Sequence, residues 1–465
     1  MCKYIKYEKC LLIYKIYMLV YLLFAFNSFI NGQTFMKYAT LLAAGAGALL
    51  LLGVLVRWKE YRKMGNCVLL ILFLLSYLFS SVMNIKYGVM ENVQEMVWLT
   101  CQMGLLYIAS YKYSADMIKK ELRILGWIWI AVCTVFNIVS LSMIGWMFNR
   151  DYVDSQGGVH AAGYRLGRLW GVYDDPNHGS VIAVIAILFA VYLWRSCQKI
   201  WQKCALVLTV AVQFAYIGFG NSRTAIIALA AGIGIWCFGI FYTRKKAVLQ
   251  SLLAALAVVI LCAGGFFALE EANVQTYSYV QKLHTEKNTV KPANKDKQNI
   301  QKSQRKQELE QDESNGRIDI WKSGLEIAGT SPVYGVSFRN MTPYTKENLP
   351  DTYIISNPIV AYDSLHNIII DVLACQGVIG LVISLLLAAN TIRILVRGAG
   401  KTDKGHSAEM VFFLSVIAAM TAASMFYTYV FYLHSPQTYI FWLCMGYIVS
   451  MAQHANEKGS EAVQI

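Results

Sequence analysis

Residues 203–246 read KCALVLTVAVQFAYIGFGNSRTAIIALAAGIGIWCFGIFYTRKK. Two apolar runs, 203–219 and 223–243, are separated by a short polar turn that leads to Arg223. Each run is close to the roughly 20 mainly apolar residues that a helix needs to cross a bilayer. The stretch therefore predicts a hairpin of two membrane-spanning helices.

The composition of the whole chain favours the same class of protein. Of its 465 residues, 57% are hydrophobic and 15% are charged, whereas soluble domains have about 45–50% apolar and about 25% charged residues. Most of the 11 cysteines lie inside apolar runs, and no CxxC pair occurs. The cysteines therefore predict neither a zinc site nor a disulfide framework.

Twelve apolar runs can be counted along the chain, although the fourth, with Glu95 and Gln102, is weak. The sequence predicts an all-α polytopic membrane protein with about twelve transmembrane helices and a large extracytoplasmic loop that carries amphipathic helices. The predicted spans are 11–31, 39–57, 67–87, 92–110, 124–147, 178–195, 203–219, 223–243, 250–269, 377–396, 409–433 and 436–453.

The net charge of +13 comes mainly from basic loops between the apolar runs. With twelve spans, the clusters that begin at Arg57, Lys112, Arg195, Arg244 and Arg393 all lie on the side of the N-terminus. Basic loops favour the cytoplasm, so we expect a multi-pass protein of the cytoplasmic (inner) membrane with both termini cytoplasmic. Nucleic acid is excluded as a partner because the charges form no patch with interleaved aromatic residues.

The two long connections, 148–177 and 270–376, are then extracytoplasmic. Residues 281–315 are charged and rich in Gln and Asn, so we expect a mobile segment or a solvated helix there. The next segment predicts an amphipathic helix near the membrane surface, which ends at Gly329 before Pro332. Its apolar face is expected to contain Ile318, Trp321, Leu325 and Ile327.

Four segments that combine arginine or histidine with Gly, Pro or Asn all fall on the extracytoplasmic side: 164–179, 220–225, 316–321 and 363–367. Arginine in short external loops opposes the positive-inside trend. Arg223 is the clearest case, because Ser222 is a good N-cap and Arg223 would begin the helix. A cation there meets the positive end of the helix dipole, at a cost of about 0.3–1 kcal/mol that a bound anion would reverse.

Arginines from three segments facing one compartment suggest a diphosphate clamp, because the planar guanidinium binds phosphate oxygens in pairs. Arg223, Arg317, Arg165 and Arg168 are its candidates, and the last two would share a face if locally helical. Asn177 and Asn367 are further candidates for substrate binding. The alternatives are arginines that reach lipid headgroups and ordinary solvated loop charges.

His366 is the candidate general base. With Asp363 or Ser364 as N-cap, it would lie in the first turn of a helix running to about residue 375. A helix N-terminus keeps imidazole neutral, and neutral imidazole can accept a proton from a hydroxyl group. Asp363 could orient the ring. The alternative is a polar capping residue in contact with water, and a zinc site would need more ligands.

The turn Asp174-Asp175-Pro176-Asn177 is a candidate cation site. Two carboxylates and one amide oxygen are too few for a cage made by the protein alone. Pro176 is instead expected to start a helix that Asp175 or Asn177 caps. No metal site is therefore predicted.

Four stretches together resemble one known family: GRLWGVYDDPNHG (167–179), GNSRTAIIAL (220–229), GRIDIWKSGLEIAGTSPVYGVS (316–337) and SLHNIIIDVLACQGVIGLV (364–382). In this order they are similar to motifs of the O-antigen ligase and O-antigen polymerase superfamily. The resemblance covers roughly 160–395. It divides the chain into N-terminal helices 1–5 (1–147), a ligase/polymerase-like core (148–396), and C-terminal helices 11–12 with a cytoplasmic tail (397–465).

The resemblance implies a GT-C-like membrane glycosyltransferase without metal or other cofactor. Such enzymes move a glycan from a polyprenyl-diphosphate carrier to a hydroxyl acceptor at the outer face of the cytoplasmic membrane. The family's essential arginines correspond to Arg223 and Arg317, with Arg168 a further candidate, and its essential histidine corresponds to His366. The implied partners are the lipid-linked glycan, the glycan acceptor, the bilayer and other polysaccharide assembly proteins.

The chain departs from the family pattern at Ser337, where a second glycine is common, and in its long charged insert 281–315. Three functions stay open. A polymerase would join repeat units of a capsule, exopolysaccharide or O-antigen, and it is preferred slightly. A ligase would attach finished glycan to a lipid, wall polymer or protein. A transporter or flippase is less favoured, because the spans contain few charged residues.

Overall fold

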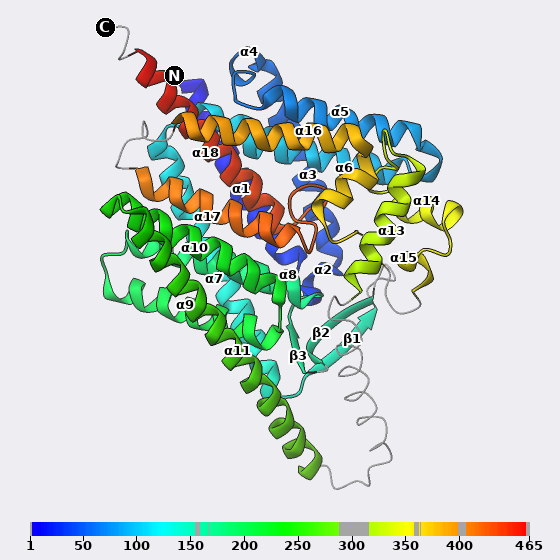
Figure 1. Ribbon diagram of the computed structural model, residues 1–465, viewed down its shortest axis with the longest axis vertical. Helices are drawn as coiled ribbons and strands as arrows, with labels where there is room; N and C mark the ends of the chain where they lie inside the picture. The colour runs from blue at the N-terminus through cyan, green and yellow to red at the C-terminus, as the bar shows by residue number, and fades with distance from the viewer. Residues whose placement is uncertain are drawn as a thin grey trace.

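The computed structural model describes residues 2–153, 159–165, 167–287, 316–357, 362, 364–398 and 406–461, and over these the chain is an all-α polytopic membrane protein (Figure 1). Eight helices in this part of the chain are long and apolar enough to cross a membrane. They are α3 (Thr34–Val56), α7 (Ala115–Gly145), α8 (Pro176–Trp194), α9 (Ile200–Gly220), α10 (Arg223–Lys245), α11 (Val248–Lys287), α16 (Ile368–Gly398) and α17 (Ser407–Ser424).

The other four predicted spans are also helical. They correspond to α1 (Cys2–Ala25), α5 (Cys67–Met83), α6 (Met90–Cys101) and α18 (Pro436–Glu461). Apolar runs form helices in a bilayer because only internal hydrogen bonds can satisfy the backbone there. The number of membrane crossings beyond eight stays a prediction. Shorter helices are α2 (Ser28–Asn31), α4 (Trp58–Tyr61), α13 (Arg317–Thr330), α14 (Met341–Asn348) and α15 (Tyr353–Ser356).

The helices differ in how deeply they lie in the protein. In α8, 83% of the membrane-span window is buried, compared with 17% in α3 and 11% in α11. The apolar residues of α3 and α11 therefore face the lipid, whereas those of α8 pack against other helices. Figure 1 shows α13, α14, α15 and the strands on one side of the bundle, while both termini lie at the opposite side.

Glu95, in the weak fourth predicted span, has a specific partner. After α6 the chain continues as a π-helix, Gln102–Tyr107, and a 3-10 helix, Ile108–Lys112. Glu95 is buried, and the Arg339 guanidinium lies 2.7 Å from its carboxylate. A buried carboxylate is tolerated in such a position when it is paired and hydrogen-bonded.

A small antiparallel sheet in the first long connection was not predicted. It has the order β1-β2-β3, with β1 (Asn149–Val153), β2 (Val159–Arg165) and β3 (Arg168–Gly171). Arg165 and Arg168 are paired across the β2–β3 turn. This segment is therefore not helical, and the two arginines do not share a helical face. Strand pairing satisfies the backbone here, and Val, Tyr and Trp favour strands.

The second long connection packs against a break in α16. Gly377 has a φ of +63° and interrupts the helical backbone, and a β carbon there would lie 2.3 Å from the carbonyl of Val333. The amide of Ser337 donates to Cys375 O (2.8 Å) across the same contact. Ser337 itself has a φ of +70°, the left-handed region that favours the glycine common in the family. Its buried hydroxyl bonds to Asn92.

The amphipathic helix exists as α13 and ends at Thr330, close to the predicted end. Of the predicted apolar face, Ile327 is buried, whereas Ile318 and Leu325 are 51% and 54% exposed. Ile320, which was not predicted to lie on that face, is also buried. The buried face lies against the start of α16, where a β carbon on Gly324 would meet Leu365 and Ile370. This contact with residues before and in α16 buries Ile320 and Ile327, and the periodicity of the sequence does not reveal it.

Two helix ends also differ from the prediction. Helix α11 continues to Lys287, beyond the expected end at residue 269, and covers the first part of the segment 281–315; residues 288–315 of that segment lie outside the described residues. Helix α17 ends at Ser424 instead of residue 433. Residues 425–435 are irregular, and Tyr429 and Tyr432 among them are buried. Irregular backbone at membrane depth is stable when protein surrounds it.

Candidate functional site

Two helix starts lie together at one end of the bundle. Helix α8 begins at Pro176, and Asp175 caps it by accepting a hydrogen bond from the Asn177 amide (2.6 Å). Helix α10 begins at Arg223, and the Ser222 hydroxyl accepts from the Ala225 amide (3.3 Å). Both starts agree with the prediction, since capping depends on local sequence. Two sets of helix N–H groups therefore point toward this end.

Asn177 joins these two helix starts. Its side-chain oxygen accepts hydrogen bonds from the Ser222 hydroxyl (3.0 Å) and from the Arg168 guanidinium (3.2 Å). Arg168 also donates from Nε to Gly220 O (2.9 Å). The structure thus brings Arg168 and Asn177 together. Both hold protein groups in place, which gives them a framework role beside the predicted anion site.

Arg317 reaches the start of α10 from a distant part of the chain. It is the first residue of α13, and its Nη2 donates to the Thr224 hydroxyl (3.2 Å), next to Arg223. Its guanidinium also lies 5.4 Å from the ring centre of Phe426. The structure therefore brings the two predicted main arginines to one place.

The electrostatics of this place favour an anion. Burial lowers the pKa of the Arg317 guanidinium, and the like charge on Arg223 lowers that pKa further. Tyr429, Tyr427 and Asp175 act in the opposite direction. Guanidinium groups keep their charge in proteins, so two like charges remain close together beside helix N–H groups. An anion bound between them would relieve this repulsion.

Tyr427, from the irregular segment after α17, connects the groups around Asp175. Its hydroxyl donates to Asp175 Oδ2 (2.6 Å). Its ring stacks on Tyr429, with centroids 5.0 Å apart, and lies edge-on to two imidazoles, 4.4 Å from His178 and 4.5 Å from His366. One tyrosine thus links the start of α8 with the segment before α16.

Asp175 is held as a carboxylate. Burial raises its pKa, but the charge of His178, the Tyr427 hydroxyl, the Asn177 amide and the charge of Arg168 outweigh burial and lower the pKa below its usual value. Its oxygens are therefore hydrogen-bond acceptors at neutral pH. Among the residues that the structure describes, no group of three or more His, Cys, Asp or Glu side chains is arranged to hold a metal ion.

His366 lies close to the predicted position but not in the predicted conformation. Helix α16 begins at Ile368, and Asn367 caps it by accepting from the Ile369 amide (3.0 Å). The expected caps, Asp363 or Ser364, are thus wrong, because Asn directly before the helix caps it well. His366 precedes the helix with a φ of +53°, a rare conformation outside glycine. The proposed contact of Asp363 with the ring lies outside the described residues.

Asp371 fixes the segment that carries His366. Its buried carboxylate accepts from the Leu365 amide (2.8 Å) and from the Thr428 hydroxyl (2.6 Å). Asn367 adds a third connection by donating to Met425 O (3.2 Å). These bonds tie residues 364–367 to residues 425–428. They explain why His366 stands against Tyr427, and they make Asn367 a positioning residue.

The structure places Arg165, a predicted site residue, in contacts away from the start of α10. It forms an ion pair with Asp151 within the sheet, and its Nη2 lies 3.1 Å from Asp151 Oδ2. Its guanidinium also lies 5.4 Å from the Trp170 ring centre. Neither contact involves the start of α10. Arg168, by contrast, donates from Nε to Gly220 O, just before the start of α10.

His178, Tyr427 and Tyr429 were missed by the sequence analysis. His178 stands in the motif DDPNHG, directly after the residues predicted to start and cap the helix. The tyrosines fell within the predicted span 409–433. The run MFYTYVFYLHS (425–435) has many aromatic and β-branched residues, which are weaker helix formers than leucine or alanine. That composition was the available signal that the helix ends early.

Part of the chain matches a known family. Residues 208–385 match the family model described as O-antigen ligase. The matched region runs from α9 into α16 and contains Arg223, Arg317 and His366. It lies inside the core predicted at 148–396, and it confirms the resemblance found in the sequence. No curated protein was found to match the chain.

Proposed function

We propose that this chain, whose residues 208–385 match the family model described as O-antigen ligase, is a membrane glycosyltransferase that uses a polyprenyl-diphosphate-linked glycan as its donor. The acceptor is a sugar hydroxyl group, and the reaction takes place at the outer face of the cytoplasmic membrane. One observation carries the proposal: Arg317 donates to Thr224, beside Arg223, at the N-terminus of α10.

A diphosphate suits this arrangement. Helix N–H groups bind phosphate oxygens, and the dipole favours negative charge at that end. The planar guanidinium can bind two oxygens of a phosphate at once, so two arginines can hold both phosphates of the leaving group. As the bond to the sugar breaks, negative charge grows on the diphosphate. Arginines already in place stabilise this charge most strongly in the transition state.

The chemical step is a substitution at the anomeric carbon. The acceptor hydroxyl oxygen forms a bond to this carbon, the bond from the carbon to the diphosphate oxygen breaks, and its electron pair leaves with the diphosphate. The hydroxyl proton passes to the His366 imidazole, which acts as the general base. The contacts of Tyr427 with His366 and Asp175 support this assignment, because they hold the Tyr427 ring edge-on against the imidazole.

A deletion strain tests the proposal and separates its two forms. Loss of a polymerase leaves single repeat units on the acceptor, and loss of a ligase leaves full-length polymer on the lipid carrier. We expect one of these outcomes, the first if the slight preference for a polymerase is right. Surface glycan is extracted and its length is read by gel electrophoresis, with a complemented strain as the control. Unchanged glycan length and attachment in the deletion strain would contradict both forms.

A further inference from the structure

We infer that a groove between α8, α9, α10 and α11 binds an anionic phospholipid, with the lipid phosphate at Arg195 and Arg244 and an acyl chain along the groove. This site is distinct from the one around Arg223 and Arg317. The inference does not depend on the proposed transferase activity.

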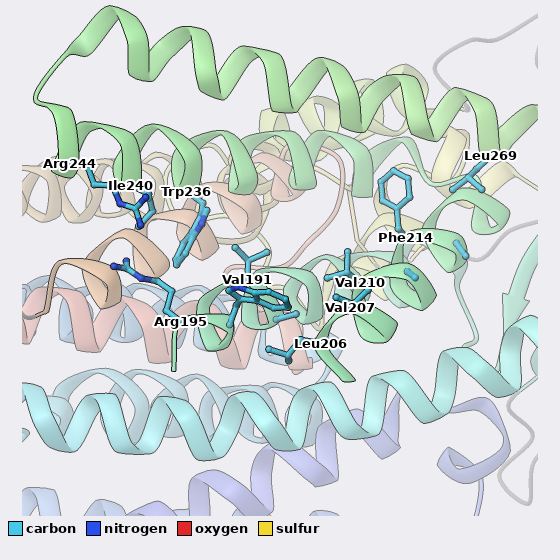
Figure 2. A pocket seen from close by; sticks show the side chains of 14 residues that line it. Val191, Arg195, Leu206, Val207, Val210, Phe214, Trp236, Ile240, Arg244 and Leu269 are labelled. Carbon is cyan, nitrogen blue, oxygen red and sulfur yellow. The ribbon is translucent and has the colours of Figure 1, made fainter. Parts of the chain in front are cut away.

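The groove is apolar along its length. It has a volume of about 640 Å³, within the range of small-molecule binding sites. Figure 2 shows the side chains of α9 and α10 that face each other across it. The lining includes Leu206, Val210, Phe214, Trp236, Ile240 and Leu269. An apolar channel at the lipid-facing side of a membrane protein fits a hydrocarbon chain.

One end of the groove is cationic. Arg195 caps the C-terminus of α8, and Arg244 lies in the last turn of α10. Both side chains line the groove, and Figure 2 shows them at the same end, near Ile240 and Trp236. Lys203 adds a third positive charge, with its Nζ 5.7 Å from the Trp194 ring centre. Two guanidinium groups above an apolar channel complement a phosphate joined to an acyl chain.

The length of the groove matches one leaflet. From Leu206 to Phe214, α9 advances eight residues, or about 12 Å at 1.5 Å per residue. Half of a bilayer's hydrocarbon core is about 15 Å thick. A single acyl chain of one leaflet therefore fills the groove, while a polyprenyl chain would extend well beyond it.

The position of the arginines separates this ligand from the proposed donor. Arg223 and Arg244 stand at opposite ends of α10, 21 residues apart, which corresponds to roughly 32 Å. A lipid whose phosphate is at Arg244 thus belongs to the leaflet opposite the candidate functional site. The predicted topology makes this the cytoplasmic leaflet, which is rich in anionic lipid.

The test uses the purified full-length protein and native mass spectrometry, with phosphatidylglycerol and phosphatidylcholine of identical acyl chains as probes. We expect phosphatidylglycerol to bind more tightly to the wild-type protein. The double variant Arg195→Ala/Arg244→Ala should weaken phosphatidylglycerol binding by about tenfold or more, since it removes charge-assisted hydrogen bonds, and should bring it near phosphatidylcholine. Arg195→Lys/Arg244→Lys should keep part of the preference.

Two further variants test whether the lipid binds in this groove and not at other basic surfaces. Ala211→Trp, which places a large side chain in the groove, should weaken binding of both lipids. Arg393→Ala/Arg397→Ala removes two exposed arginines from the end of α16, outside the groove lining, and should bind as the wild type does. The inference is wrong if the Arg195/Arg244 variant keeps the full phosphatidylglycerol preference, if Ala211→Trp has no effect, or if polyprenyl phosphate displaces phosphatidylglycerol from the wild type at equal concentration.

Discussion

Arg317→Ala and Arg223→Ala should each lower the rate of glycan transfer by about a hundredfold or more, the range seen when one group that stabilises transition-state charge is removed. Both guanidinium groups stand at the start of α10, where Arg317 bonds to Thr224. Transfer is measured with membranes that contain equal amounts of each variant. Near-normal activity in either variant would remove that arginine from the mechanism.

Arg165→Ala is the matched control for these variants. It also removes an external arginine, but its ion pair with Asp151 and its contact with Trp170 keep it within the sheet. We expect its transfer activity to stay close to that of the wild type. A loss as large as that of Arg317→Ala would show that activity depends on external positive charge in general and not on the two arginines at α10.

The double variant Arg223→Ala/Arg317→Ala tests whether the two arginines act on one group. If both bind the same diphosphate, the loss in the double variant should be smaller than the product of the two single losses, because residues that share a partner are not additive. If the losses multiply fully, the arginines act on separate parts of the substrate. The two lysine variants should retain part of the activity, since lysine keeps the charge but not the planar fork.

His366→Ala should lower the turnover of glycan transfer by about 10²–10⁴-fold, the usual contribution of a positioned general base. Binding of the lipid-linked donor should change little, because the imidazole acts on the acceptor hydroxyl. The measurement is the rate at saturating donor, compared with donor binding to the same purified variant. A loss of donor binding with unchanged turnover would contradict the role as a base.

His454→Ala is a suitable control for the histidine variant. His454 lies near the end of α18, where its ring is 5.2 Å from Tyr111. Figure 1 shows the C-terminal end of α18 on the side of the bundle that carries the termini. Its removal should leave transfer unchanged. His178→Ala is informative in another way, because His178 contacts Tyr427 and lowers the pKa of Asp175. We expect a loss of transfer rate smaller than that of His366→Ala, because removal of the His178 ring disturbs Tyr427, which contacts His366.

Features of the site that depend on local sequence could be predicted. Ser222 and Asp175 cap their helices because a short polar side chain before an apolar run satisfies the first free N–H groups. The apolar runs predicted the membrane-spanning helices, because a backbone inside a bilayer must form its hydrogen bonds internally. The arginines of interest were visible because they oppose the usual charge distribution.

Features that depend on contacts between distant segments could not be predicted. Composition indicates that helix α17 ends early, but its exact end at Ser424 depends on partners elsewhere in the chain, since Trp442 donates to Val430 O (2.6 Å) in the irregular segment. His366 leaves the helix because Asn367 caps it and Asp371 binds the Leu365 amide. No periodicity in residues 362–371 shows that Thr428, 57 positions after Asp371, donates to its other carboxylate oxygen.

The most direct measurement combines the purified protein with a polyprenyl-diphosphate-linked glycan and an acceptor glycan, with and without a metal chelator. The proposed reaction predicts a lengthened or newly attached glycan together with an equal amount of free polyprenyl diphosphate, unchanged by the chelator and lost in Arg223→Ala. Movement of the intact lipid-linked glycan across a vesicle membrane without new glycosidic bonds would contradict the proposed transfer, and loss of product on chelation would contradict its independence of metal.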